Sequence, residues 1–539
     1  MNDRVIKNGR IIDGTGAAPF KGDIVVRGDE IEAVERNLAV PSSYQITDAS
    51  GLIVSPGFID THSHSDISLI LCPDAQSALF QGVTTEVIGN CGLSAFPISG
   101  QTKEQLQAYL RGIGYDNTVE FDWTDLEGYA ATVGSNGIGI NIAPLVGHGS
   151  IRIAVMGFEA REARDEELAA MKQLLETSLD QGALGLSSGL VYPPGINSST
   201  AELTALCAPL AGRGAIYTTH LRGDTLKTGP TLVESLEEAL SIARQTGVHL
   251  HVSHAAPKFP NTGAVQSVIA MMQAARNHGV EVTCDAHPYL AAMTFLASLL
   301  PPWVFAGGIK ETLLRLTDQN ERAQVVKAVK TSFEHLDPDT FWPLNEISMP
   351  DSNSEFNRLR LDAIGRKTAL APAEALVEIL AQSNEKLFEV LVLQWIYSAR
   401  ETRELFGWGG TMVGADGASS TLGRAGGPLT IHPRSWGTFP KMIHEYCQKD
   451  PWLTIEELIH RMTGLAASSM GLNDRGLIQP GKKADIIAFD PAHFKDMATF
   501  AKPQQYAEGI RHVWVNGRPV IDQGKCTGQR PGKILRGNR

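Results

Sequence analysis

Two histidines that could share one metal ion, His62 and His64, follow an apolar run that ends at Ile59. Along an extended strand, side chains two residues apart point to the same side, so one ion can bind both imidazoles. Such a pair alone is weak evidence for a metal site, because two ordinary surface or core histidines can have the same spacing. It becomes stronger evidence if other metal-binding side chains follow other strands.

Four more side chains with metal-binding chemistry do follow apolar runs, and they are Cys91, His220, His254 and Asp416. Each alone has an ordinary structural explanation: a buried thiol, a core histidine or an aspartate in a turn. His220 and His254 are about one βα unit apart, which would place them on neighbouring strands. Together with the first pair they supply Cys/His/His and His/His/Asp ligand sets with positions left for water, which suits Zn²⁺.

These side chains need a scaffold that brings distant segments together, and the middle of the chain predicts a (β/α)₈ TIM-like barrel. Apolar runs typical of buried strands alternate there with amphipathic stretches such as 160–181 and 231–245. This alternation indicates parallel βα units, and eight units over roughly 400 residues fit a closed barrel, whose active site lies at the C-terminal ends of its strands. The eight runs are Leu52–Ile59, Thr84–Ile88, Gly137–Leu145, Gly182–Ser187, Ala215–Thr219, His249–Ser253, Val280–Asp285 and Thr411–Gly414.

The two ends of the chain differ in pattern from its middle. They contain short apolar runs broken by Gly and Asp, which predict small antiparallel strands. We therefore expect a small β-sandwich domain built from residues 1–55 and 480–539, and a catalytic barrel over residues 56–479. Within the barrel, the segment from about 290 to 365 is too long for a normal loop and predicts an insertion with its own helices, such as 310–331.

The overall composition excludes several classes of protein. The 539 residues include 47 Lys+Arg against 59 Asp+Glu, which gives a net charge of −12, and no basic block is present. Nucleic acid is therefore not an expected partner. No apolar run reaches the roughly 18 residues that a membrane span needs. Six scattered cysteines and the lack of a signal-peptide pattern predict a soluble, cytoplasmic protein with reduced thiols, whose assembly into homo-oligomers is left open.

Several motifs resemble the D-aminoacylase (N-acyl-D-amino-acid deacylase) branch of the amidohydrolase superfamily of metal-dependent barrel hydrolases. The similarity extends over nearly the whole chain and is specific in combination. It rests on PGFIDTHSH (56–64), GNCG (89–92), LVGHGSIR (145–152), GLVYPPG (189–195), HLRGD (220–224), HPRSWGTFP (432–440) and GIRHVWVNG (509–517).

The resemblance implies a zinc ion held tightly by Cys91, His220 and His254. It also implies a second, weaker metal position at His62, His64 and Asp416. Many relatives in the superfamily, including cyclic amidases, bridge two metals with a carboxylated lysine at the end of the fourth strand, but residues 182–189 contain no lysine. The thiolate of the cysteine can supply the missing anionic ligand, because a metal-bound thiol is deprotonated.

The activity that follows is zinc-dependent hydrolysis of the amide bond of N-acyl-D-amino acids or related N-acyl amides, releasing a carboxylate and an amine. Zinc lowers the pKa of a water ligand toward ~7 and polarises the amide carbonyl. Asp416 is the predicted general base, which takes the proton of water and delivers it to the departing amine. Two alternatives remain: a cyclic-amide hydrolase of the dihydroorotase or hydantoinase kind, which the missing lysine disfavours, and a metal-binding barrel that has lost catalysis.

Recognition of a substrate carboxylate requires a cation, for which an arginine fork is best suited. Arg434 matches the family arginine with that task, although a surface ion pair is an equal explanation of the residue. The family also has a lysine two residues beyond the second zinc histidine, but that place is Ala256 here, and Lys258 is displaced by two. Either Lys258 reaches the substrate, or the substrate lacks a free α-carboxylate.

Three more residues are candidates for the substrate pocket. Tyr192 and Tyr289 are predicted walls, with buried aromatic packing as the alternative. His148 either lines the site or satisfies a loop carbonyl. The apolar stretch Leu290–Leu300 contains no Arg or Lys. If it lines the pocket, a hydrophobic substrate side chain is favoured over aspartate or glutamate.

Overall fold

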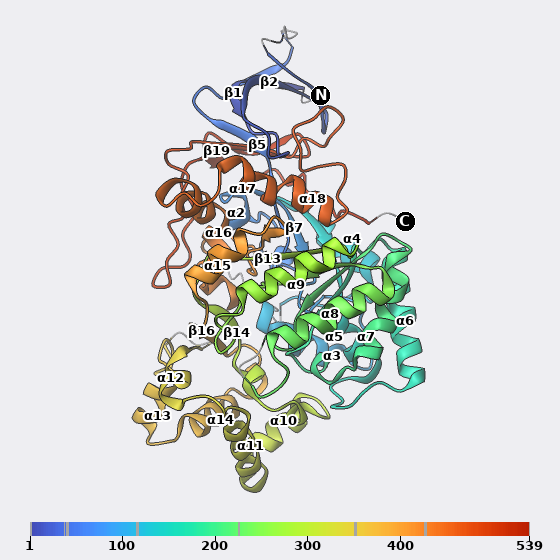
Figure 1. Cartoon of the computed structure of the whole chain (residues 1–539), viewed down its shortest axis with the longest axis vertical. Coiled ribbons are helices and arrows are strands. Elements are labelled where there is room, and N and C mark those ends of the chain that lie inside the picture. Colours follow the sequence, from blue (N-terminus) through green and yellow to red (C-terminus); the bar gives the residue numbers. More distant parts are fainter. Residues whose placement is uncertain are drawn as a thin grey trace.

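The molecule is elongated, with a small β domain at one end, a barrel in the middle and a helical insertion at the other end (Figure 1). The computed structural model describes residues 3–36, 38, 43–114, 118–224, 227–349, 353–424 and 428–537. Among these residues, no helix is both long and apolar enough to cross a membrane.

Short parallel strands, almost entirely buried, form the barrel. Its two sheets contain β6 (Phe58–Asp60), β7 (Val83–Ile88) and β8 (Asn141–Pro144), and β9 (Val146–Gly147), β10 (Gly185–Gly189), β11 (Ile216–His220), β12 (His249–Val252), β13 (Val282–Ala286) and β17 (Thr411–Val413). Only Leu145 separates β8 from β9, and a parallel bridge between Ser63 and Gly417 joins the ends of β6 and β17. Each of the eight predicted runs overlaps a barrel strand, so the barrel expected from the sequence is confirmed. The first run, Leu52–Ile59, also contains β5 of the β domain, and β9 lies outside the runs.

Amphipathic helices cover the outer face of the barrel (Figure 1). Four follow its strands in order: α6 (Asp165–Asp180), α7 (Thr200–Ala211), α8 (Leu232–Thr246) and α9 (Val265–Asn277). Helix α8 begins at a capping box in which the Thr231 hydroxyl accepts from the amide of Glu234 and the Glu234 carboxylate accepts from the amide of Thr231. The others around the barrel are α1 (Ser68–Leu71), α2 (Gln76–Leu79), α3 (Lys103–Leu110), α4 (Leu126–Gly134), α5 (His148–Met156), α15 (Ala399–Phe406), α16 (Arg434–Ile443), α17 (Ile455–Met462) and α18 (Gly464–Ser469).

The insertion between β13 and β17 is longer than the sequence predicted. It contains the antiparallel sheet β14 (Ala292–Phe295), β16 (Leu391–Gln394) and β15 (Asn345–Ser348), and the helices α10 (Ile309–Thr317), α11 (Gln319–Ser332), α12 (Pro338–Phe341), α13 (Leu361–Thr368) and α14 (Pro372–Gln382). Because β16 pairs with β14, the insertion extends well beyond residue 365. The single helix expected over 310–331 is wrong. It breaks at Asp318, whose carboxylate accepts from the amides of Asn320 and Glu321 at 2.9 and 3.0 Å and caps α11.

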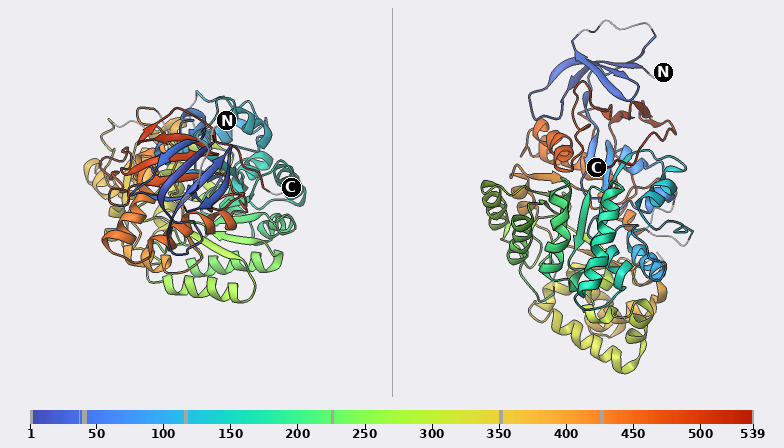
Figure 2. Two further views of the ribbon diagram at one scale, coloured as in Figure 1. Left: turned by 90° about the horizontal axis from the view of Figure 1, so that it is seen from above. Right: turned by 90° about the vertical axis from the view of Figure 1, so that its right-hand side faces the viewer.

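Both ends of the chain meet in one nine-stranded sheet (Figure 2, left). It contains β1 (Arg4–Ile11), β2 (Phe20–Arg27), β3 (Glu30–Glu35), β4 (Gln45–Asp48), β5 (Ile53–Pro56), β18 (Ile486–Phe489), β19 (Ile510–Val515), β20 (Arg518–Asp522) and β21 (Lys525–Cys526). The two chain ends are joined by antiparallel pairing of β5 with β18. Most pairings are antiparallel as expected, but β1 pairs in parallel with β4 and β5. The exact division of the chain at residues 55 and 480 stays a prediction.

A buried carboxylate, Asp485, joins the β domain to the base of the barrel. It accepts hydrogen bonds from the amide of Asn516 at 2.7 Å and from the side chain of Asn141, on β8, at 3.0 Å. It also forms an ion pair with Arg475, whose side chain is equally buried. Removal of one partner from such a pair leaves an uncompensated buried charge.

We expect Asp485→Ala to lower the free energy of unfolding by about 3–5 kcal/mol, because Arg475 would stay buried without its main counter-charge. The matched control is Asp474→Ala, since Asp474 pairs with the same arginine at 3.0 Å but is half exposed. Its loss should cost about 1 kcal/mol or less. Urea unfolding followed by fluorescence compares the three proteins. Equal midpoints for the two variants would show that Asp485 is not a structural link.

Candidate metal centre and active site

The candidate site is a cavity of about 80 Å³ at the C-terminal ends of the barrel strands, next to the insertion. The segments that follow the barrel strands bring most of its charged lining, and β14 and the short helix Leu296–Leu299 bring much of its apolar lining. The polar and charged residues that line it include His64, Cys91, His220, Asp224, His254, Lys258, Asp416 and Arg434. Most of the side chains that the sequence marked for chemistry therefore meet in one place.

The first ligand cluster is the predicted tight zinc site. The ligand atoms of Cys91, His220 and His254 all lie within 4.8 Å of one another, and Cys91 Sγ is 3.7 Å from His254 Nε2. All three residues are buried. Within the described part of the chain, neither ring nitrogen of His220 has a partner with hydrogen-bond geometry. Buried imidazole nitrogens without partners are costly unless a further ligand is bound, so this donor set fits a zinc ion.

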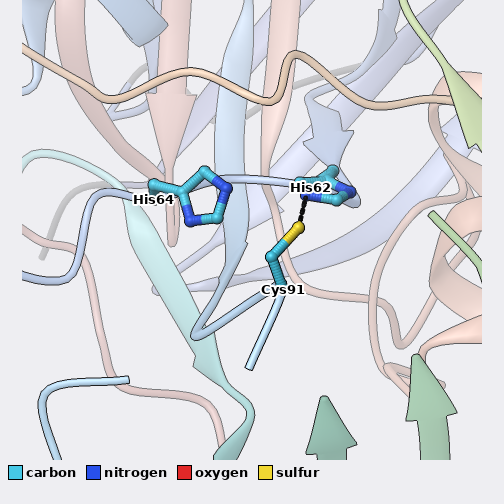
Figure 3. A group of neighbouring side chains, drawn as sticks. All are labelled: His62, His64 and Cys91. Carbon is cyan, nitrogen blue, oxygen red and sulfur yellow. Dashed lines mark hydrogen bonds between the residues drawn. The ribbon is translucent and has the colours of Figure 1, made fainter. Parts of the chain in front are cut away.

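The second cluster shares the thiol of the first (Figure 3). His62, His64 and Cys91 also have ligand atoms within 4.8 Å of one another, and Cys91 Sγ lies 3.3 Å from His62 Nε2. Asp416 Oδ1 is 3.1 Å from His64 Nε2 and 3.5 Å from His62 Nε2. The two expected ligand sets therefore overlap at the Cys91 sulfur.

The surroundings of Cys91 favour its thiolate. Burial alone would raise the pKa of the thiol, but the charge on His62 and the imidazoles of His220 and His254 hold it well below its usual range. Cys207 is also fully buried but lacks such neighbours, and burial raises the pKa of its thiol well above the usual range. A thiolate is the form that binds a metal.

Three of these residues have a backbone conformation that is rare outside glycine. Cys91, His254 and Asp416 have φ angles of 53°, 34° and 53°. Left-handed geometry costs roughly 1–2 kcal/mol for a residue with a Cβ, so the surroundings must hold it in place. The carbonyl oxygen of Cys91 lies 2.0 Å from where a Cβ on Gly189 would stand, so only glycine fits there. The close packing of the GNCG turn against β10 therefore positions the thiol.

Two carboxylates that the sequence analysis did not assign orient the histidines. Asp285, on β13, accepts from His62 Nδ1 at 3.1 Å and from the amide of His254 at 2.8 Å, so His62 presents Nε2 to the thiol. Asp224 Oδ2 lies 3.1 Å from His254 Nδ1 and 3.4 Å from His220 Nε2. Such partners fix the ring orientation of metal-binding histidines. The sequence did contain a signal for the role of Asp285, because this charged residue stands at the end of an apolar run.

Asp416 and Arg434 form an ion pair at the cavity wall, with Arg434 Nη1 2.7 Å from Asp416 Oδ2. The amide of Asp416 donates to the carbonyl of His62 at 2.8 Å, which fixes the carboxylate beside the histidines. Burial alone would raise the pKa of Asp416, but Arg434 and the hydrogen bond with His64 hold it well below its usual range. Arg434 is almost fully buried and also donates to the carbonyl of Met293 at 3.2 Å. It is not the surface ion pair that the sequence left as an alternative.

Lys258 reaches the cavity from its displaced position. Its ammonium pairs with Asp224, lies 3.1 Å from His254 Nδ1 and is 5.3 Å from the ring centre of Tyr397. The side chain is nearly buried. Ala256, at the family lysine's place, is not among the residues that line the cavity.

Of the three further residues predicted for the substrate pocket, one lines the cavity and two do not. Tyr192 lines the cavity, its ring 5.1 Å from that of His220. Tyr289 does not line it, and its hydroxyl donates to the carbonyl of Pro433 at 3.2 Å. His148 also lies outside, and its partner is a carboxylate rather than a loop carbonyl: His148 Nε2 is 2.7 Å from Glu202.

A parallel barrel with overlapping Cys/His clusters and a carboxylate at its strand ends has the features of a metal-dependent hydrolase. Comparison with known proteins supports this class. The sequence pattern of the amidohydrolase family matches residues 45–298 and 424–521, and the chain belongs to that family.

Individual relatives match over nearly the full length. The chain is 35% identical to the N-acyl-D-aspartate deacylase of Alcaligenes xylosoxydans xylosoxydans, over 99% of this chain and 95% of that protein. The structure of N-acyl-D-glutamate deacylase from Bordetella bronchiseptica, with zinc and a phosphonate that mimics the tetrahedral intermediate, is 32% identical, with a TM-score of 0.81 and 99% of both chains covered. A D-aminoacylase structure with a binuclear metal centre is 30% identical, with a TM-score of 0.81, over 99% of this chain and all of that one.

We expect Cys91→Ser to weaken zinc binding at least about tenfold, because it removes the only thiolate from the ligand set. The matched control is Cys207→Ser, which changes an equally buried thiol outside the site and should leave the zinc content unchanged. Zinc is quantified by atomic absorption after dialysis against a series of free-zinc buffers. Equal zinc affinity in Cys91→Ser and the wild type would contradict the assignment.

Proposed function

We propose that the protein hydrolyses the amide bond of N-acyl-D-amino acids and releases a carboxylate and a D-amino acid. The observation that carries the proposal is the convergence of Cys91, His220 and His254 beside an ionised Asp416 in one cavity. The relatives named as deacylases supply the substrate class, and preference for the D enantiomer comes from them alone. The six free cysteines support a cytoplasmic location.

Cys91, His220 and His254 are the proposed ligands of a tightly bound zinc ion. When bound, zinc supplies a Lewis acid that acidifies water and polarises an amide carbonyl. His62, His64 and Asp416 form the proposed weaker position. The 3.3 Å approach of the Cys91 sulfur to His62 supports a thiolate that serves both positions.

Asp416 is the proposed general base. Its carboxylate is held beside two histidines and faces the cavity, and its depressed pKa keeps it ionised at neutral pH, so it can accept a proton from water. It would then deliver that proton to the amide nitrogen as the C–N bond breaks, so that the product leaves as a neutral amine. Arg434, paired with its other oxygen, fixes the orientation of the carboxylate.

Arg434 and Lys258 are the proposed partners of the substrate's α-carboxylate, and Tyr192 is a proposed wall. The two cations line the same cavity as the ligand cluster, and each is nearly buried. Tyr289 and His148, which lie outside this lining, are proposed to act only by packing. His148 is hydrogen-bonded to Glu202. Burial alone would raise the pKa of the Glu202 carboxyl, but this hydrogen bond and the charge of the neighbouring Arg152 lower it to about 2.

The two alternatives have weaker support. A cyclic-amide hydrolase with a lysine bridge is disfavoured because β10 carries no lysine, and Ser188 there donates to Thr219 at 2.8 Å instead. A barrel without catalysis is disfavoured because every predicted ligand and the candidate base lie together. Activity against hydantoins would favour the first alternative, and no activity in a zinc-loaded protein would favour the second.

We expect Asp416→Asn to retain zinc at the Cys91 cluster and to lower kcat by about 10²–10⁴-fold, because the amide cannot accept the proton. Zinc content and steady-state hydrolysis of N-acetyl-D-leucine are measured on the same sample. Zinc equal to that of the wild type controls for damage to the metal site. Activity within a few-fold of the wild type would refute the role of Asp416.

The proposed contacts of Arg434 and Lys258 predict that the enzyme binds a substrate less well when its α-carboxylate charge is removed. Replacing N-acetyl-D-leucine by N-acetyl-D-leucinamide should lower kcat/KM about 10–100-fold, because charge-assisted hydrogen bonds of roughly 1.5–3 kcal/mol are lost. Release of acetate is followed for both compounds. Equal values would show that Arg434 and Lys258 do not bind the α-carboxylate.

A further inference from the structure

We infer that the substrates of this site have a neutral, apolar side chain, and that N-acyl-D-aspartate and N-acyl-D-glutamate are poor substrates. The inference rests on the proposed function and specifies it further. The names of the relatives do not decide the matter, because two of those compared above are named for acidic substrates. The lining of the cavity carries the argument.

One part of the cavity is apolar and lies close to the ligand cluster. Tyr192 connects the two parts: its ring centre is 5.1 Å from that of His220 and 4.9 Å from that of Phe295. A substrate whose amide bond lies at the cluster therefore has a branch within reach of this wall. Its apolar lining includes Leu93, Ile113, Val191, Phe295, Leu299 and Ile396.

The apolar wall is supported from behind. The ring of Phe295 packs edge-on against Tyr109 and Phe388, at 5.8 and 5.3 Å between ring centres. Gly112 lies so close that a Cβ there would stand 3.1 Å from the Phe295 ring. This part of the lining is therefore packed hydrocarbon, and the neutral side chains near it, such as Thr294 and Ser298, carry no counter-charge for a carboxylate.

The cavity has few cationic side chains besides its histidines. Among the lining residues that the structure describes, Lys258 and Arg434 are the only lysine and arginine. Lys258 pairs with Asp224, and Arg434 pairs with Asp416. Between residues 43 and 537, the positions outside the described ranges contain neither Lys nor Arg.

A further lysine, Lys227, is bound to the backbone of the insertion. Its ammonium donates to the carbonyls of Ser298 and Leu300 at 2.7 and 3.2 Å, and it is not among the cavity-lining residues. The described lining therefore contains no lysine or arginine beyond the two proposed for the α-carboxylate. A second carboxylate would be buried without a counter-charge, beside the carboxylates of Asp224 and Asp416.

The test uses a pair of substrates with the same shape and different charge. For the zinc-loaded wild type at pH 7.5, we expect kcat/KM for N-acetyl-D-glutamine to exceed that for N-acetyl-D-glutamate at least 100-fold, and N-acetyl-D-methionine to be better than both. A value for N-acetyl-D-glutamate equal to or above that for N-acetyl-D-glutamine overturns the inference and leaves the proposed function intact. No hydrolysis of any N-acyl-D-amino acid refutes the proposed function, and the inference with it.

Variants test where the substrate side chain lies. Leu299→Lys places a cation in the apolar lining and should raise the ratio of kcat/KM for N-acetyl-D-glutamate over N-acetyl-D-glutamine at least tenfold. Leu314→Lys is the matched control, because Leu314 is 58% exposed on α10 of the same insertion, and its ratio should not change. Thr294→Lys, at a half-buried lining position, is a second variant that should act like Leu299→Lys. Unchanged ratios in the folded, zinc-loaded lining variants would overturn the assignment.

Discussion

The structure depends on one electrostatic constraint: a buried thiol surrounded by imidazoles at the end of the barrel. Cys91 contributes to both ligand clusters, and the positive charge near it stabilises its thiolate despite complete burial. Two carboxylates contact the ring nitrogens of these histidines that face away from the thiol. Asp285 accepts a hydrogen bond from His62, and Asp224 pairs with His254. A divalent cation is the group that such a concentration of donors accommodates best.

The site is formed at the expense of local strain in the backbone. Cys91, His254 and Asp416 stand just beyond strand ends in left-handed conformations, where the chain must turn sharply to point their side chains inward. The amide of His254 donates to Asp285, and the amide of Asp416 donates to the carbonyl of His62. These two hydrogen bonds stabilise two of the turns. Strain offset in this way by surrounding structure is common at functional sites.

The insertion contributes much of the apolar lining of the cavity. Its strand β14 lies against the strand ends, where the carbonyl of Met293 accepts from Arg434 and Thr294 donates to Tyr192. The same segment presents Phe295 and Leu299 to the cavity. The barrel therefore supplies the candidate ligands, whereas the insertion supplies much of the hydrocarbon that lines the cavity. Because the two are separate in the chain, we expect that the apolar lining can change without disturbance of the ligand clusters.

The sequence by itself determined the barrel strands, the pairing of the two chain ends and the side chains that form the candidate ligand clusters, because buried strands and the polar residues that follow them leave local patterns. It did not reveal the full length of the insertion, the break in its helix at Asp318, or the roles of Asp285 and Asp224. It predicted five residues of the substrate pocket. Of these, Tyr192, Lys258 and Arg434 line the cavity, whereas Tyr289 and His148 do not. Periodicity reports whether a residue is buried, but which distant residues it meets depends on long-range packing, and only the tertiary structure decides that.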